Sequence, residues 1–281
     1  MNSKNDVADL GFQVIAFKLD FATTDTKPTV TLVADSSVAA SGINAAILRR
    51  AMRWVAGYAS APYVTSSPSG LLQTVQVDVP EFRRIGLPYL RPLAGNQATA
   101  TVLPGPDPNL HVSLYDGPIV PPGEPLTIQA VRRSAISGST GVVLLWLAYG
   151  INPLPPGEAF NIEYTSNTDA GVTPLTWAPL TLTWTSSLPS GRYAIVGMEH
   201  SALNALAARL VLPEGPRAGV LAQDKLWERT HRIFYEGELG VYGYFDSPAM
   251  PNIEALATTG STDHRGYLRI IRIGDVGCPC H

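Results

Sequence analysis

Proline and glycine interrupt this sequence at short intervals along its whole length. The chain contains 25 glycines and 24 prolines among 281 residues, and they are scattered rather than gathered in one linker. Proline lacks a backbone donor and glycine weakens the interior of a helix, so long helices do not fit between such breaks. Turn residues at intervals of roughly 8–12 residues are typical of β-sandwiches and barrels. The sequence therefore predicts an all-β protein.

Short apolar or alternating runs lie between these turns and predict the strands. Residues 199–212 fit either a helix or a strand. The run Val142–Leu147 is apolar at every position, which predicts a central strand that is buried on both faces, because such a strand at an edge would aggregate. The predicted strands are 12–21, 29–33, 72–79, 98–103, 110–115, 126–131, 142–149, 160–165, 175–184, 193–198, 233–245, 253–257 and 267–273.

Three of the turns have similar residues. Pro121–Glu124, Pro155–Glu158 and Leu188–Gly191 each place proline shortly before glycine and lead directly into a predicted strand. Proline fixes the backbone of one turn residue, and glycine can supply a positive φ. The first two turns are only 34 residues apart, too close to be equivalent points of two duplicated domains. We interpret all three as the same turn chemistry used at different places.

Residues 41–58 follow a helical pattern instead. Their apolar side chains recur at intervals of three to four positions, and Arg49 and Arg53 fall on the opposite side. We therefore expect one short amphipathic helix here, in the N-terminal half. The cluster Arg49, Arg50 and Arg53 suits phosphate groups or the headgroups of an anionic membrane. The alternative is a helix that covers one end of a sandwich and exposes a solvated basic face.

The length of the chain allows one large sandwich or two domains of roughly 130 residues each. Asn, Pro and Gly gather at 150–157, directly after the most apolar run. We expect the domain boundary there. The N-terminal domain, 1–150, would then contain the helix, and the C-terminal domain would be 151–281.

The composition argues against several classes of function. The formal net charge is −3 and the pI about 5.9, so we expect no sequence-specific binding of nucleic acid, which needs a basic surface. Cys278 and Cys280 are too close for an unstrained bridge, which fits a reducing cytoplasm. Together with His281 they supply only three ligands on a tail, too few for a strong metal site. The N-terminus lacks the layout of a secretion signal, and the run 142–149 is too short to span a bilayer.

The sequence contains none of the strong local signatures of catalysis. G-x-S-x-G, H-E-x-x-H, G-x-x-x-x-G-K and paired cysteines with zinc spacing are all absent. Glu199-His200 and Asp263-His264 each place an acid beside an imidazole, but neighbouring side chains of a strand point apart. We therefore expect a protein that is not an enzyme and that holds no cofactor and no metal. A β-rich enzyme, the rival interpretation, would use His200, His231 or His264 with acids distant in sequence.

Five segments between about residues 118 and 273 carry a resemblance to a known family. They are Gly141–Tyr149, Pro155–Glu158, Leu188–Gly197, Ala207–Leu210 and Gly237–Phe245. Together they resemble the double jelly-roll major capsid proteins of tailless, internal-membrane-containing icosahedral phages, such as the corticovirus and finnlakevirus groups.

The resemblance implies two side-by-side eight-stranded jelly rolls in one chain. It also implies a structural major capsid protein, made in the host cytoplasm and located in the virion. Such subunits form homotrimers that contact neighbouring capsomers, other virion proteins and an internal lipid membrane. Five aromatic residues that we expect at the surface would favour such contacts: Trp146, Trp177, Trp184, Tyr242 and Tyr244. The alternative is a β-sandwich protein of a virion that binds a receptor or glycan, or decorates the shell.

Overall fold

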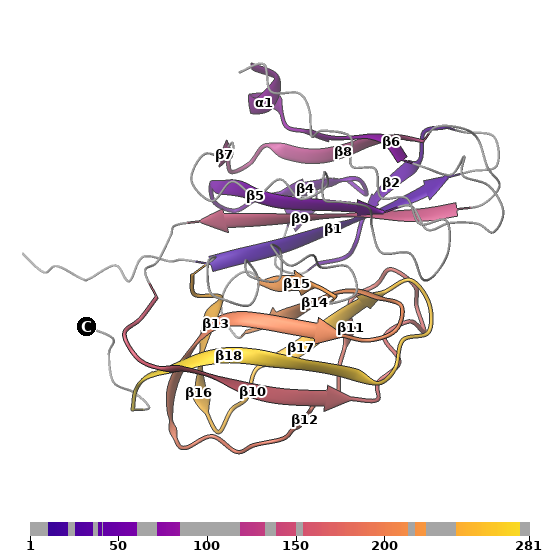
Figure 1. Cartoon of the computed structure of the whole chain (residues 1–281). Coiled ribbons are helices and arrows are strands. Elements are labelled where there is room, and N and C mark those ends of the chain that lie inside the picture. The colour runs from indigo at the N-terminus through magenta and orange to yellow at the C-terminus, as the bar shows by residue number, and fades with distance from the viewer. Residues whose placement is uncertain are drawn as a thin grey trace, which may run out of the picture. The chain divides into compact units, whose positions relative to one another are not determined.

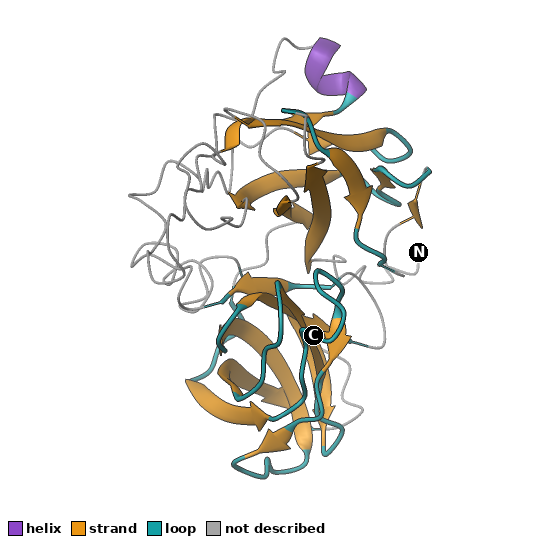
Figure 2. Ribbon diagram, turned by 90° about the vertical axis from the view of Figure 1, so that its right-hand side faces the viewer, coloured by secondary structure: helices purple, strands orange, loops and turns teal. Residues whose placement is uncertain are grey.

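The chain divides into two compact units. One consists of Val14–Leu147, called here the N-terminal unit, and the other of Ala148–His281 with Met1–Gln13, called here the C-terminal unit. The described chain is all-β apart from one short helix (Figure 2). The computed structural model describes residues 11–21, 26–35, 39–40, 42–60, 72–84, 119–132, 139–149, 154–212, 217–222 and 240–275.

Two sheets build the N-terminal unit. The first contains β1 (Gly11–Phe21), β2 (Thr29–Leu32), β5 (Met52–Ser60), β7 (Ile119–Val120) and β9 (Ser139–Tyr149). The second contains β3 (Ala39–Ala40), β4 (Ala45–Ile47), β6 (Leu72–Asp78) and β8 (Pro125–Arg132), and helix α1 (Pro80–Arg84) follows β6. Their orders are β2-β1-β9-β5-β7 and β3-β4-β8-β6 (Figure 1).

Two further sheets build the C-terminal unit. The first contains β10 (Ala159–Ser166), β12 (Thr183–Trp184), β13 (Gly191–Ser201), β16 (Gly243–Ser247) and β18 (His264–Gly274). The second contains β11 (Ala178–Pro179), β14 (Ala205–Val211), β15 (Gly219–Leu221) and β17 (Asn252–Ala257). Their orders are β12-β10-β18-β13-β16 and β11-β17-β14-β15 (Figure 1).

The described strands of the two units follow the same order. In one sheet of each unit, the first long strand (β1 or β10) lies beside the last (β9 or β18). The last strand lies beside a middle strand (β5 or β13), which lies beside a short edge strand (β7 or β16). In the other sheet, the next-to-last strand (β8 or β17) lies between two strands that precede it in the sequence. These are β4 and β6 in the N-terminal unit, and β11 and β14 in the C-terminal unit. The described strands of the two units therefore share one connectivity.

The centre of β9 is the most buried part of the N-terminal unit. Every side chain of Val142–Leu147 is at most 1% exposed, and β1 and β5 pair with the two edges of the strand. Full burial of one large apolar side chain stabilises a fold by roughly 1.5–3 kcal/mol. The prediction of a central strand buried on both faces is confirmed.

Most of the other predicted strands that fall on described residues are confirmed. The ambiguous residues 199–212 form the end of β13 and all of β14. The predicted strand 175–184 is much shorter than expected, because only β11 and β12, of two residues each, form within it. The predicted strands 98–103 and 110–115, and the first part of 233–245, lie outside the described residues.

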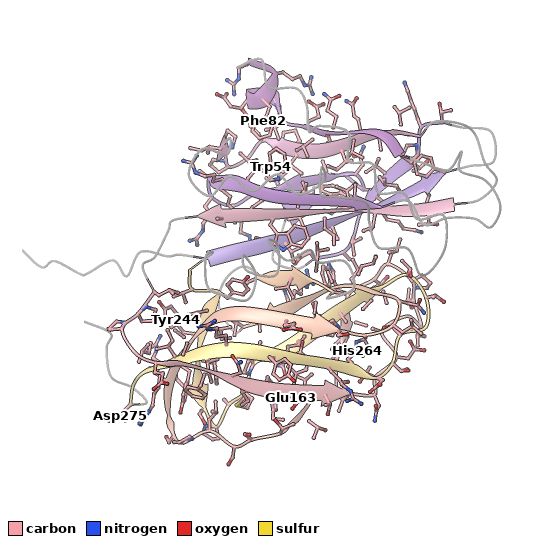
Figure 3. All side chains as sticks on the ribbon, in the orientation of Figure 1. Trp54, Phe82, Glu163, Tyr244, His264 and Asp275 are labelled. Atoms are coloured by element: carbon pink, nitrogen blue, oxygen red, sulfur yellow. The ribbon has the colours of Figure 1, made fainter. Side chains whose placement is uncertain are left out.

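The prediction of a helix at 41–58 is wrong, because this segment forms β4, a bend and most of β5. A Cβ atom on Gly57 would lie 3.4 Å from the side chain of Leu145 and 3.7 Å from the carbonyl oxygen of Leu144, so β5 packs closely on β9. A helix would leave one edge of the buried strand β9 without backbone partners, which is costly in a core. This long-range pairing overrides the local spacing of apolar residues. The helix that the structure describes is α1, which buries Phe82 (Figure 3).

The three similar turns enter strands that are not equivalent in the shared path. Pro121–Glu124 leads into β8, Pro155–Glu158 into β10 and Leu188–Gly191 into β13. Gly123 and Gly157 have φ of 79° and 139°, as the turn chemistry predicts, whereas Gly191 has no positive φ. The turns are therefore repeated local chemistry and do not mark equivalent positions of the two units.

The register between β13 and β18 shifts once in the middle of the strands. Ile195 lies opposite Ile270, but Gly197 lies opposite Arg269, so Val196 is an extra residue in β13. Such a β-bulge interrupts the alternation of side chains between the two faces. Ile195 and Met198 are consequently both buried opposite buried residues of β18.

Replacing Leu145 by Asp tests the placement of β9. The aspartate would lie at a position that is 0% exposed, and an unpaired carboxylate there costs more than the unit can tolerate. We expect the L145D variant to accumulate as insoluble protein. Leu203, which is 78% exposed, provides the matched control, and L203D should stay folded. Folded L145D protein with wild-type circular dichroism would contradict the placement.

Candidate functional site

The three candidate arginines do not share a helical face. Arg49 and Arg50 are exposed in the bend between β4 and β5, whereas Arg53 is half-buried in β5 opposite Ile119 of β7. Arg50 and Arg53 also take part in interactions within the chain. Of the three arginines, Arg49 and Arg50 are the exposed ones. Their contact with phosphates stays a prediction.

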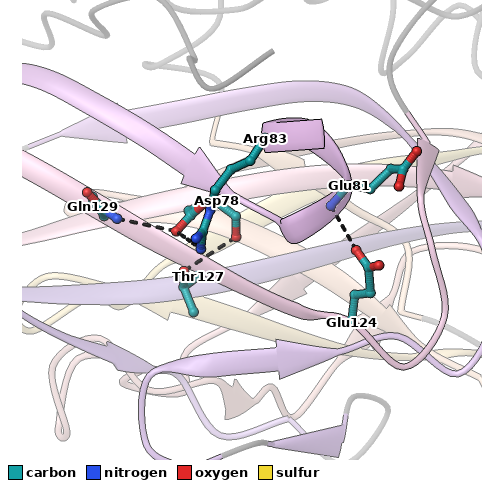
Figure 4. A network of polar contacts seen from close by, with 6 residues as sticks. All are labelled: Asp78, Glu81, Arg83, Glu124, Thr127 and Gln129. Carbon is teal, nitrogen blue, oxygen red and sulfur yellow. Dashed lines mark hydrogen bonds and ion pairs between the residues drawn. The ribbon is translucent and has the colours of Figure 1, made fainter. Parts of the chain in front are cut away.

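A polar network ties α1 to the second sheet of the N-terminal unit (Figure 4). The Asp78 side chain, only 7% exposed, forms an ion pair with Arg83, which is 62% exposed. Nη2 of Arg83 donates to Oδ2 of Asp78 at 2.6 Å, and Nε2 of Gln129 on β8 donates to the same oxygen at 3.3 Å. The hydroxyl of Thr127 donates to the Asp78 carbonyl oxygen at 3.4 Å. Asp78 therefore joins β6, α1 and β8.

Glu124 forms the second half of this network. Its Oε2 accepts the backbone amide of Glu81 at 3.0 Å (Figure 4). Its Oε1 accepts Nη2 of Arg84 at 2.6 Å. The turn that carries Glu124 is fixed in its own right, because the amide of Gly123 donates to the Leu48 carbonyl oxygen at 3.1 Å. A carboxylate at the start of a helix satisfies amides that lack an intrahelical partner. The arrangement holds α1 in place.

A chain of buried polar side chains crosses the interior of the C-terminal unit. The Tyr164 hydroxyl lies 2.9 Å from Nδ1 of His200, and Nε2 of His200 lies 3.2 Å from Nδ1 of His264. Nε2 of His264, at the start of β18 (Figure 3), lies 2.9 Å from the Ser261 carbonyl oxygen. The three ring side chains are 0% exposed. This chain joins β10, β13 and β18 to the segment before β18.

Burial sets the ionisation of this chain. Desolvation, with a smaller effect of the neighbouring His264, lowers the pKa of His200 to about 3. Desolvation also lowers the pKa of His264, against the opposing effects of the Ser261 and Thr168 backbone and of the Asp169 and Asp263 carboxylates. The pKa of Tyr164 is raised by burial and by Glu199. All three side chains are therefore neutral near pH 7.

Gly266 makes room for the chain. It lies opposite Tyr164 on one neighbouring strand and opposite His200 on the other. A Cβ atom at this position would overlap the Tyr164 hydroxyl and the Glu199 carbonyl oxygen. The sequence reasoning considered each histidine with its adjacent acid and missed the contact between the two histidines. No local signal marks that contact, because the residues are 64 positions apart.

A largely buried ion pair lies on the other sheet of the C-terminal unit. Nε of Arg209 donates to Oε2 of Glu254 at 2.7 Å, and Nη1 of Arg217 lies 3.4 Å from the same oxygen. The Arg209 guanidinium stacks 4.2 Å from the centroid of the Trp177 ring. A cation over an aromatic face is stabilising, and more so when it is desolvated. These contacts join β14 to β17 and to the residue before β11.

The expectation of exposed aromatic side chains is wrong for most of the five residues. Trp146, Trp177 and Tyr242 are 0%, 7% and 3% exposed, and Trp184 and Tyr244 are half-buried. Within the described ranges, the most exposed large apolar side chains lie outside the long strands, and they include Ile43, Val172 and Leu203.

The residues that the structure describes contain no group of three or more potential metal ligands. His231 and the Cys278, Cys280 and His281 tail lie outside those residues. In the described part of the chain, no helix is long and apolar enough to cross a membrane. Chemically, the Tyr164, His200 and His264 chain can hold or pass a proton between its members.

Replacing Asp78 by Ala tests the network around α1. The change removes a nearly buried carboxylate and leaves Gln129 without its acceptor, so we expect the free energy of unfolding to fall by about 1–3 kcal/mol. Urea denaturation measures the loss. The matched control is Asp263→Asn, because the Asp263–Arg265 pair is exposed on both sides, at 71% and 65%, and such pairs contribute little. Asparagine also tolerates the φ of 56° at this position. Equal denaturation midpoints for both variants would contradict the structural role of Asp78.

A scan against protein-family models finds no match, and neither does a search of curated proteins. Among solved structures, the chain matches the crystal structure of the STIV MCP, a viral major capsid protein. The two are 12% identical with a TM-score of 0.21, and the match covers 94% of this chain and 97% of the other. A TM-score this low does not establish a shared fold.

Proposed function

We propose that this protein is a non-enzymatic structural subunit of a virus capsid, with a jelly roll in each of its two units. The observation that carries the proposal is the strand order that both units share. A jelly roll consists of eight strands in two packed sheets built from Greek keys, and the fold is common in viral capsid proteins. A Greek key returns a late strand beside the first one.

The strand orders support this proposal. Strands β1-β9-β5-β7 and β10-β18-β13-β16 each place the last strand between the first and a middle strand. The companion sheets β4-β8-β6 and β11-β17-β14-β15 place the next-to-last strand between two earlier ones. Two such domains in one chain agree with the resemblance of the sequence to double jelly-roll capsid proteins.

The low charge of the chain supports assembly with further copies. Charged residues make up 15% of the sequence, whereas about 25% is usual in globular proteins. A surface with few charges suits a subunit that buries much of itself against neighbours, since interface cores are depleted in charged residues. We propose homotrimers that pack as capsomers in an icosahedral shell of the virion, in contact with other virion proteins and an internal membrane.

The assembly state of the purified protein tests this function. We expect a homotrimer by light scattering at micromolar concentration, and closed shells or sheets by electron microscopy at higher concentration. A capsid subunit needs self-association, whereas a receptor-binding or glycan-binding sandwich does not. A stable monomer that binds a glycan array and never assembles would contradict the proposal and favour the binding protein.

Replacing the exposed Arg49 and Arg50 tests the proposed contact with the membrane. Each basic residue near an anionic surface contributes on the order of 1 kcal/mol, so many copies in a shell bind where one subunit does not. We expect the R49E/R50E variant to assemble normally and to lose flotation with anionic liposomes. Binding by the wild type should weaken as salt rises. The control is R265E, which changes another exposed arginine. If R49E/R50E shells float as well as R265E shells, these residues have no role at a membrane.

A further inference from the structure

The chain of Tyr164, His200 and His264 has one arrangement of protons when both imidazoles are neutral. The Ser261 carbonyl oxygen only accepts, so Nε2 of His264 carries a hydrogen and its Nδ1 is an acceptor. Nε2 of His200 must then donate to His264, which leaves Nδ1 of His200 to accept the hydroxyl of Tyr164. Every ring nitrogen is satisfied, and the hydrogen bonds all run from Tyr164 toward Ser261.

One added proton reverses part of this chain. If His264 carries hydrogens on both nitrogens, Nε2 of His200 must become the acceptor and its Nδ1 must donate to Tyr164. The hydroxyl of Tyr164 then turns to the carbonyl oxygen of Glu199, which is 3.3 Å away. The hydrogen bonds survive, but a positive charge now lies in a fully buried position, which is unfavourable.

Several charged groups surround the hydrogen-bonded side chains of Tyr164, His200 and His264. The carboxylates of Asp169 and Asp263 are near His264 and favour its charged form, while the side chain of Glu199 acts on Tyr164. Asp263 is itself paired with Arg265 at 3.3 Å and is largely exposed. Asp169 accepts two backbone amides. The balance of these effects still favours neutral imidazoles, because desolvation is the largest contribution at both histidines.

The hydrogen-bonded chain of Tyr164, His200 and His264 ends at the point where three loops of the C-terminal unit meet. These loops, residues 167–172, 202–204 and 258–263, are called here the loop end. The carbonyl oxygen of Ser261 accepts the amide of Ala170 as well as His264. Oδ1 of Asp169 accepts the amides of Ser261 at 2.9 Å and Gly171 at 2.8 Å.

The third loop is joined to the same point, because Nδ2 of Asn204 donates to the carbonyl oxygen of Gly260 at 2.9 Å. A Cβ atom on Gly171 would overlap the backbone of Thr259, so two of the loops touch backbone to backbone. Ser261, which is 1% exposed, is where the loops attach to the histidines.

We propose that Tyr164, His200 and His264 form an acid-sensitive latch, which holds the loop end closed while both imidazoles are neutral and releases it when the chain takes up a proton. This role does not depend on assembly into a capsid. An open form exposes imidazoles that bind protons from about pH 6.5 downward, whereas the closed form binds them only at lower pH because the pKa of both histidines is lowered. Acid therefore favours opening, by up to about tenfold per pH unit for each proton taken up.

Hydrogen–deuterium exchange of the full chain tests the latch. The amides of Ala170, Gly171 and Ser261 report on the loop end, and the amides of β17 serve as an internal reference. After correction for intrinsic exchange rates, we expect opening of the loop end to increase about tenfold or more from pH 7 to pH 5, with β17 unchanged. The hydrogen bonds from Ser261 and Gly171 lower the pKa of Asp169 below 3.8, so this carboxylate stays ionised at pH 5 and does not cause the change. Equal protection at both pH values would overturn the proposal.

Variants separate the histidines from other acid effects. In H200Q/H264Q, amide groups can still donate and accept but do not titrate, so the pH response of the loop end should be lost. The control E158Q, which changes an exposed carboxylate of the same unit, should keep the response. A response that survives in the double variant or disappears in the control overturns the assignment. If the double variant does not fold, nitrogen-15 NMR of the wild type decides. Both imidazoles must be neutral with hydrogen on Nε2 at pH 7, and a charged ring or hydrogen on Nδ1 alone overturns the latch.

Discussion

Each unit depends on the pairing of its last long strand with its first. β9 joins β1 to β5, and β18 joins β10 to β13. The contacts span long stretches of sequence, as between the hydroxyl of Thr140 and the carboxylate of Asp20, which are 120 residues apart. Neither sheet is complete before its last strand is in place, and the closure entropy of such pairings makes folding slow. The apolar residues of β9 provide the burial that offsets this entropy.

Sequence alone predicted the features that depend on neighbouring residues. The run Val142–Leu147 predicted a buried strand, and the turn before β8 predicted the positive φ of Gly123. The helix prediction for residues 41–58 was wrong because their apolar spacing suits a helix, while the open edge of β9 requires a strand. That requirement is not visible within the segment. The order of the strands could not be predicted either. Pairing partners are chosen by burial and register across the whole unit, which local patterns do not contain.

The candidate sites were predictable to a smaller extent. The exposure of Arg49 and Arg50 follows from their charge, but their position in a bend does not. The contact between His200 and His264 requires the register of β13 on β18 and the small volume of Gly266, and neither can be read from adjacent residues. Asp78 is a similar case, since a single carboxylate becomes important only through Arg83 and Gln129. Buried polar groups specify a fold through such partners, which sequence separates widely.

The extra residue at Val196 determines on which face of β13 each later side chain lies. Side chains alternate between the two faces of a strand, so one additional residue exchanges the faces for every position that follows. Downstream of the bulge, His200 points into the unit and Glu199 points out. If the strand kept all its residues but alternated regularly from Ile195, Glu199 would point inward and His200 outward, and a carboxylate would face Tyr164 and His264. The identity of the buried group thus depends on the bulge as much as on the residue itself.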